Sequence, residues 1–208
     1  MKKLFYLAIM LAVAAIGSSA ATITYTYTGS ASGSIGNLEF GNAAFTITAV
    51  ADTANVVNHG NGVLGVTNDS ASIDITGLGT YSIFSAMASF VALNGHFAGI
   101  SHVNGGGADL IHTTTDTAFG TWDLASSIGP ITGSGEVLQW GLHPVSTSGG
   151  NLFLSDNSNA LTFQATVGET PEPGSIILLV SGLAGVGLVR FRFRETAGRR
   201  RSLVSSNS

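Results

Sequence analysis

Alternation of polar and apolar residues is the feature that most limits how this chain can fold. It is clearest over residues 22–28, Thr-Ile-Thr-Tyr-Thr-Tyr-Thr, where Ile23, Tyr25 and Tyr27 share one face of an extended strand. Short segments with strand-like patterns recur at 45–50, 72–76, 80–84, 89–93, 110–112, 119–124, 137–140, 152–154 and 161–167. We therefore expect a mainly β chain, with residues 22–168 forming an antiparallel β-sandwich or a jelly-roll-like domain.

Composition agrees with short strands joined by tight turns. The 208 residues include 28 glycines and four prolines, which argue against long helices. Asn61-Gly62, Asn94-Gly95 and Asn104-Gly105 are typical of hairpin turns. The chain has no cysteine, so disulfides, thiolate metal sites and cysteine nucleophiles are excluded.

Basic residues occur only near the two ends of the chain. The eight lysines and arginines are Lys2, Lys3, Arg190, Arg192, Arg194, Arg199, Arg200 and Arg201. By contrast, all of the 12 acidic residues except Glu172 and Glu195 lie between Ala21 and Thr170. Such an acidic region repels phosphate backbones, so we expect no nucleic-acid partner. It also has no side-chain cation with which to hold a phosphate or carboxylate substrate.

Residues 1–21 are organised as a secretory signal peptide. Lys2 and Lys3 precede an apolar run from Leu4 to Ile16, and small residues follow up to Ala21. The run is too short to span a bilayer, and the small residues suit cleavage after Ala20 or Ala21. We expect this segment to direct export and to be removed.

The C-terminal region, residues 169–208, consists of three consecutive segments. Residues 169–173 are a linker that contains Pro-Glu-Pro, and residues 174–193 are predicted to be a single transmembrane helix. The stretch from Ser175 to Val189 has no charged residue, and its glycines are common in lipid-spanning helices. Residues 194–208 form a basic tail, which the positive-inside preference places in the cytoplasm.

Taken together, residues 171–208 resemble the bacterial PEP-CTERM sorting signal. That signal consists of a Pro-Glu-Pro tripeptide, a transmembrane stretch and an arginine-rich cytoplasmic end. The matching residues are Pro171, Glu172 and Pro173, then 175–189, then the membrane-flanking Arg190, Arg192 and Arg194. The family's signal usually ends soon after its arginines, whereas this chain continues to Ser208.

The resemblance implies how such a protein is handled in the cell. Family members are exported and held transiently in the inner membrane by the C-terminal helix. They are processed by exosortase, an integral-membrane cysteine transpeptidase, in bacteria that make exopolysaccharide and extracellular matrix. We therefore expect a non-enzymatic protein of the cell surface or matrix, with exosortase and possible exopolysaccharide as partners. In this interpretation Pro171, Glu172 and Pro173 are recognised by a partner enzyme and are not catalytic.

No catalytic motif stands out in the middle of the chain. Gly-x-Ser-x-Gly is absent, and the five histidines lack metal-binding spacing. A metal pair of His102 and His112 across a hairpin is one option, although core or solvated histidines are commoner. Asp123 and Glu136 are among the candidate acids for a glycosidase, but no spacing selects a pair. The segment from Asp156 resembles the start of a calcium loop without its later ligands, so we expect a turn, and no metal or cofactor.

Aromatic residues supply the main alternative function. Trp122 and Trp140 could stack on sugar rings in a lectin-like module, while nearby acids and amides bind hydroxyl groups. The competing interpretation places both tryptophans in the core, and the small number of aromatic residues favours it. A secreted hydrolase with a dispersed site is the third alternative.

Overall fold

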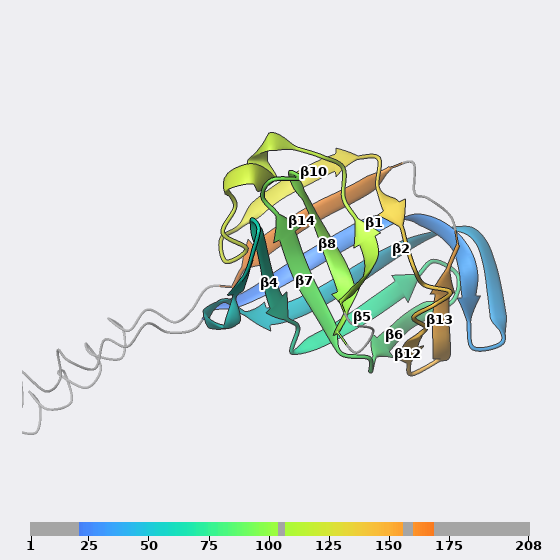
Figure 1. Cartoon of the computed structure of the whole chain (residues 1–208). Coiled ribbons are helices and arrows are strands. Elements are labelled where there is room, and N and C mark those ends of the chain that lie inside the picture. The colour runs from blue at the N-terminus through green and yellow to red at the C-terminus, as the bar shows by residue number, and fades with distance from the viewer. Residues whose placement is uncertain (1–20, 104–106, 156–159, 169–208) are drawn as a thin grey trace, which may run out of the picture. The chain divides into compact units, whose positions relative to one another are not determined.

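The computed structural model describes residues 21–103, 107–155 and 160–168. These residues belong to one unit of the chain, Ala20–Glu169, shown in Figure 1. The predicted signal peptide, the Pro-Glu-Pro linker, the transmembrane helix and the basic tail lie outside the described residues, apart from Ala21. In the part of the chain that the structure describes, no helix is long and apolar enough to span a membrane.

Antiparallel strands make up most of the described chain, which confirms the mainly β prediction. The strands are β1 (Thr22–Ile35), β2 (Leu38–Asp52), β3 (Val57–Gly60), β4 (Val63–Thr67), β5 (Ser70–Ile75), β6 (Gly79–Ile83), β7 (Met87–Ala92), β8 (Phe97–His102), β9 (Ala108–His112), β10 (Ile128–Gly133), β11 (Glu136–Val137), β12 (Val145–Thr147), β13 (Gly150–Leu154) and β14 (Leu161–Val167). Two 3-10 helices, η1 (Thr53–Asn55) and η3 (Thr117–Thr121), lie between strands. The larger sheet has the order β10-β14-β1-β13-β12-β6-β5-β2, and the smaller has the order β11-β9-β8-β7-β4-β3.

The larger sheet closes on itself through the long strand β1. One edge of β1 pairs with β14 near its start and with β13 near its end, while the other edge pairs with β2. The pairings β1–β2–β5–β6–β12–β13 therefore return to β1 and form a closed ring of six strands. The alternation of the sequence did not predict this closure, because the second half of β1 contains Gly29 and Gly33 and loses its strict pattern.

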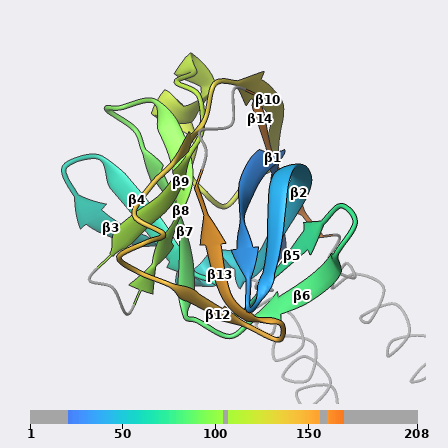
Figure 2. The same cartoon turned by 90° about the vertical axis from the view of Figure 1, so that its right-hand side faces the viewer.

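The smaller sheet packs against the larger one across a shared core. Figure 2 shows β3, β4, β7, β8 and β9 as one layer and β1, β2, β5 and β6 as the other. Tyr25, Tyr27 and Phe163 of the larger sheet belong to the same buried cluster as Val91 and Ile100 of the smaller sheet. The predicted strand face of Ile23, Tyr25 and Tyr27 is the buried face of β1, as the alternation indicated.

Two predicted strands are not formed as expected: only Val137 of residues 137–140 belongs to a strand, β11, and residues 119–124 form none. Residues 119–124 do not form a strand, because the chain makes the helix η3 there and then turns. The Asp116 side chain starts η3 by accepting a hydrogen bond of 2.8 Å from the Ala118 backbone. The segment therefore buries Phe119 from a short 3-10 helix and Trp122 from the extended residue that follows it, and not from one face of a strand.

Two of the three predicted Asn-Gly hairpin turns are confirmed. Asn61 and Gly62 join β3 to β4 with φ values of 53° and 77°, the left-handed backbone that such turns require. Asn94-Gly95 lies between β7 and β8 as predicted. Asn104-Gly105 falls outside the described residues, although the flanking strands β8 and β9 pair.

Candidate functional site

Both tryptophans of the lectin alternative are core residues. Trp122 is 5% exposed and Trp140 is 1% exposed. Trp140 donates its indole N–H to the Leu110 carbonyl oxygen over 2.8 Å, and Trp122 donates to the Ser126 carbonyl oxygen over 2.8 Å. Since both rings are covered by the protein, neither offers a face to a sugar ring, and the core interpretation is the correct one.

Trp122 belongs to an aromatic group inside the core. Its ring contacts Phe163 at a centroid distance of 5.5 Å, Phe119 at 6.1 Å and Tyr25 at 6.2 Å. Edge-to-face arrangements of this kind stabilise a core beyond the area that they bury. These aromatic side chains therefore hold η3 and β14 against β1.

The histidine pair of the metal alternative is not brought together. His112 on β9 is opposite Gly99, whereas His102 on β8 is opposite Ala108. His102 is buried and its ring is 6.4 Å from that of His143. Within residues 21–103, 107–155 and 160–168, no three histidine, aspartate or glutamate side chains gather in a way that could hold a metal ion.

Asp123 and Glu136 have separate surroundings. The Asp123 carboxylate accepts hydrogen bonds from the Ser126 hydroxyl at 2.7 Å and from the backbone N–H groups of Ala125 and Ser126. The Ser126 hydroxyl is the main cause of the lowered pKa of Asp123, with the backbone N–H groups adding to it. Glu136 lies on the edge strand β11, opposite His112. Asp123 thus holds a local turn, and the structure gives no reason to pair it with Glu136 as a glycosidase acid.

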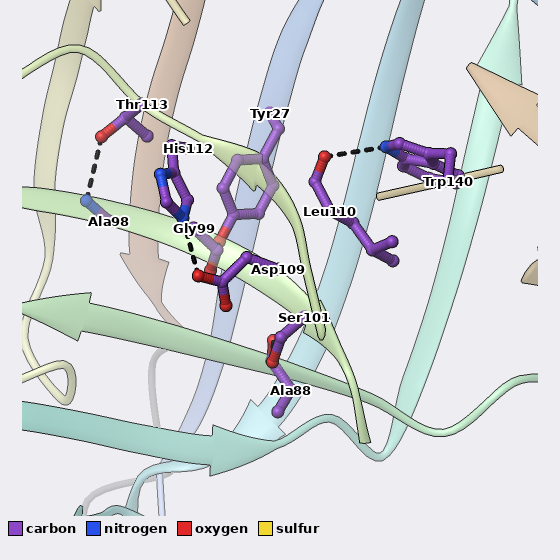
Figure 3. Close-up of polar contacts among 10 residues, drawn as sticks. All are labelled: Tyr27, Ala88, Ala98, Gly99, Ser101, Asp109, Leu110, His112, Thr113 and Trp140. Atoms are coloured by element: carbon purple, nitrogen blue, oxygen red, sulfur yellow. Dashed lines mark hydrogen bonds and ion pairs between the residues drawn. The ribbon is translucent and has the colours of Figure 1, made fainter. Parts of the chain in front are cut away.

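The outer face of the smaller sheet carries an aromatic group that the sequence did not indicate. Phe90, Gly99 and His112 are direct neighbours across β7, β8 and β9, and Phe97 contacts the same group. The Phe97 and His112 rings are 4.4 Å apart, and His112 Nε2 lies 2.9 Å from Asp109 Oδ2. Figure 3 shows His112 beside Asp109, with Tyr27 reaching Gly99.

A pocket of about 570 Å³ lies on this outer face, beside the aromatic group. Its floor includes Gly65 of β4 and Ala88 of β7, which are small residues on neighbouring strands. Polar side chains around it come from η1, β3, β4, the β4–β5 turn and β8: Asn55, His59, Thr67, Asp69 and Ser101. Val57, Val66, Val103 and Gly107 also line it.

Two glycines make room for rings on this face. A Cβ atom at Gly65 would lie 2.8 Å from His59 Nε2, so the imidazole lies directly over that glycine. A Cβ atom at Gly99 would lie 2.5 Å from the Phe90 ring and 2.3 Å from the Ile111 carbonyl oxygen. His59 therefore lies in the pocket, while the Phe90 ring leans toward Gly99.

No sequence motif predicts this pocket. Its residues run from Asn55 to Gly107 and come from four strands, a 3-10 helix and two connections. Only the strand register places Gly65, Ala88 and Ser101 on one face. The sorting residues Pro171, Glu172 and Pro173, and the arginines at 190, 192 and 194, lie outside the described residues.

Comparison with known proteins gives no family. No family model matches the chain, and neither a curated protein nor a solved structure shows significant similarity to it.

Proposed function

We propose that this is an exported, non-enzymatic protein of the cell surface or extracellular matrix. In this proposal the N-terminal 21 residues are a signal peptide, and residues 174–193 hold the chain in the inner membrane. Exosortase processes it at Pro171-Glu172-Pro173, and the two packed sheets are an ectodomain of the sandwich or jelly-roll type. The main sequence observation behind this proposal is that every lysine and arginine lies within residues 2–3 or 190–201.

The ends of the β domain support this proposal. Ile23 is the direct neighbour of Val167 in the sheet, and the Gly168 N–H donates to the Thr22 carbonyl oxygen over 2.7 Å. The two flanking segments therefore join the domain at neighbouring positions. Because residues 22–167 contain all the described strands, cleavage before Thr22 and after Glu169 removes none of them. Processing on both sides is thus compatible with an intact domain.

A pair of glutamate variants in the native host tests the processing. Glu172→Ala removes the acidic residue of the tripeptide, and Glu169→Ala removes an acidic residue three positions earlier as a matched control. We expect the wild type and Glu169→Ala to reach the surface or medium in a shortened form, detected by an antibody against the β domain. Glu172→Ala should accumulate uncut in the inner membrane. Equal processing of all three proteins, or recovery of the wild type as an uncut soluble chain, contradicts the proposal.

A further inference from the structure

We propose that the pocket on the outer face of the smaller sheet binds a non-anionic saccharide of about disaccharide size. The ligand is bound and not hydrolysed. The inference concerns the β domain alone and does not depend on the sorting proposal, because none of the pocket residues belongs to the terminal segments. In this proposal the sugar contacts residues of the pocket and not the buried Trp122 and Trp140.

Size and shape are the first argument. At about 570 Å³ the pocket lies within the range of about 300–1,000 Å³ that is usual for small-molecule sites. Ala88 keeps part of its floor open, since a longer side chain there would enter the space, while Gly65 leaves room for the His59 ring. The volume is much larger than the roughly 30 Å³ of a single water molecule. A disaccharide is a ligand of suitable size.

Hydrogen-bonding capacity is the second argument. Within the described residues, the side chains of Asn55, His59, Thr67 and Asp69 make no hydrogen bond to the rest of the protein. Together they provide an amide, an imidazole, a hydroxyl and a carboxylate, which both donate and accept. Sugar hydroxyls also do both, so a saccharide can use all four groups.

The walls of the pocket also carry apolar side chains, which can contact the C–H faces of a sugar ring. Val57 is 53% exposed and Val103 is 39% exposed, and both line the pocket. They are two of only six large apolar side chains that stand out as exposed in the described part of the chain. Sugar rings have C–H faces that are stabilised by contact with apolar groups, whereas a small ion has none.

Charge selects among saccharides. Asp69 is the only carboxylate in the pocket wall, and residues 4–189 contain no lysine or arginine to pair with an anion. Residues 22–168 carry nine acidic side chains, so the field around the pocket repels anions. Uronic acids and sulfated sugars are therefore disfavoured, and neutral or amine-bearing sugars are favoured.

Titration calorimetry on the full chain tests the ligand class. The protein is kept in a polyoxyethylene detergent, because maltoside detergents are themselves sugars. The probes are cellobiose, maltose, lactose, diacetylchitobiose and the glucosamine dimer, with digalacturonic acid as the anionic comparison. We expect at least one neutral or amine-bearing probe to bind with a Kd of about 1 mM or tighter, and digalacturonic acid to bind at least about tenfold more weakly. Binding of none of the first five, or preference for the acid, overturns the proposal.

Two variants locate the binding. Ala88→Leu fills the floor and should abolish measurable binding, while Asp69→Asn keeps the shape and should weaken binding about tenfold. The controls are Ala44→Leu, at an exposed position of β2, and Asp74→Asn, at an exposed position of β5, and both should bind as the wild type does. Thermal unfolding verifies that each variant is folded, and Thr67→Leu replaces Ala88→Leu if the latter does not fold. Undiminished binding by the folded floor variant shows that the sugar binds elsewhere and contradicts the inference.

The two proposals fail separately. Loss of sugar binding in Ala88→Leu should leave processing in the native host unchanged. An uncut chain in Glu172→Ala should still bind the same disaccharide with the affinity of the wild type.

Discussion

Tyr27 on β1 donates a hydrogen bond of 2.7 Å to the carbonyl oxygen of Gly99 on β8, 72 residues later in the chain. This bond crosses the core and joins the two sheets, because β1 belongs to the larger and β8 to the smaller. On the outer face, Gly99 also leaves the space that the Phe90 ring occupies. One residue therefore connects the core with the face that carries the pocket.

Removing this bond should destabilise the domain. Tyr27→Phe removes this buried hydrogen bond, which costs about 0.5–1.5 kcal/mol of unfolding free energy. Tyr81→Phe is a matched control, because the Tyr81 hydroxyl makes a longer bond of 3.1 Å to the Leu78 carbonyl oxygen in a half-buried place. We expect the control to lose less. Urea unfolding of both variants measures the difference, and equal losses contradict a special role for Tyr27.

A methyl group at Gly99 should be poorly tolerated. In Gly99→Ala the new Cβ would meet the Ile111 carbonyl oxygen, a backbone atom that cannot turn away as a side chain can. We expect a loss of about 1–3 kcal/mol, as for other overpacked sites. Gly41→Ala is the control, since nothing lies within 4 Å of its Cβ position, and its effect should stay within about 0.5 kcal/mol. Equal unfolding midpoints for the two variants would show that β8 and β9 are not packed as described.

The buried tyrosines should ionise only when the domain unfolds. Burial raises the pKa of both Tyr25 and Tyr27 well above its usual value, and for Tyr25 the nearby Asp123 charge adds to the shift. A raised pKa in the folded state favours the protonated form, so the stabilisation is complete below about pH 10 and decreases as the pH rises further. Absorbance at 295 nm and circular dichroism should therefore report a shared alkaline transition. Complete tyrosine ionisation with a native dichroism spectrum contradicts the burial of these two rings.

The tryptophans should affect stability and not sugar binding. Trp140→Phe removes one of two donors to the Leu110 carbonyl oxygen, the other being the Leu138 N–H, and puts a smaller ring in a buried place, so it should cost about 1–3 kcal/mol of unfolding free energy. It should leave the calorimetric affinity for the neutral disaccharide unchanged, because the ring is buried away from solvent. A large loss of affinity in this variant, with stability retained, would return the tryptophans to the binding site.

The sequence predicts this fold best where one strand face is buried throughout. Residues 22–28 and 161–167 alternate strictly, and they pair with each other as neighbouring strands of the larger sheet. Val57–Gly60 has no such pattern, because every residue of this edge strand is exposed and nothing selects apolar side chains on one face. Residues 128–133 were not predicted to be a strand either, because Pro130 cannot donate to a sheet ladder. The structure accommodates it because β10 is an edge strand, where proline is tolerated.

Site residues can be predicted from the sequence when they follow one another along the chain, but not when only strand register brings them together. The sorting residues follow one another along the chain, so their order alone suggests their role, and that role stays a prediction. The pocket depends on register, which the sequence does not state. His102 and His112 illustrate the difficulty, because the register shifts between Ile100 and Ser101 and the two histidines pair with different residues. A one-residue shift in register moves side chains to the other face of the sheet, so it changes which side chains meet.

The intact mass of the mature protein from its native host tests the central claim most directly. Intact mass is needed because residues 4–189 contain no lysine or arginine, so trypsin leaves the β domain uncut. The account predicts a chain that begins near Ala21 or Thr22 and ends within or close to Pro171-Glu172-Pro173. A mature chain that still ends at Ser208 contradicts it.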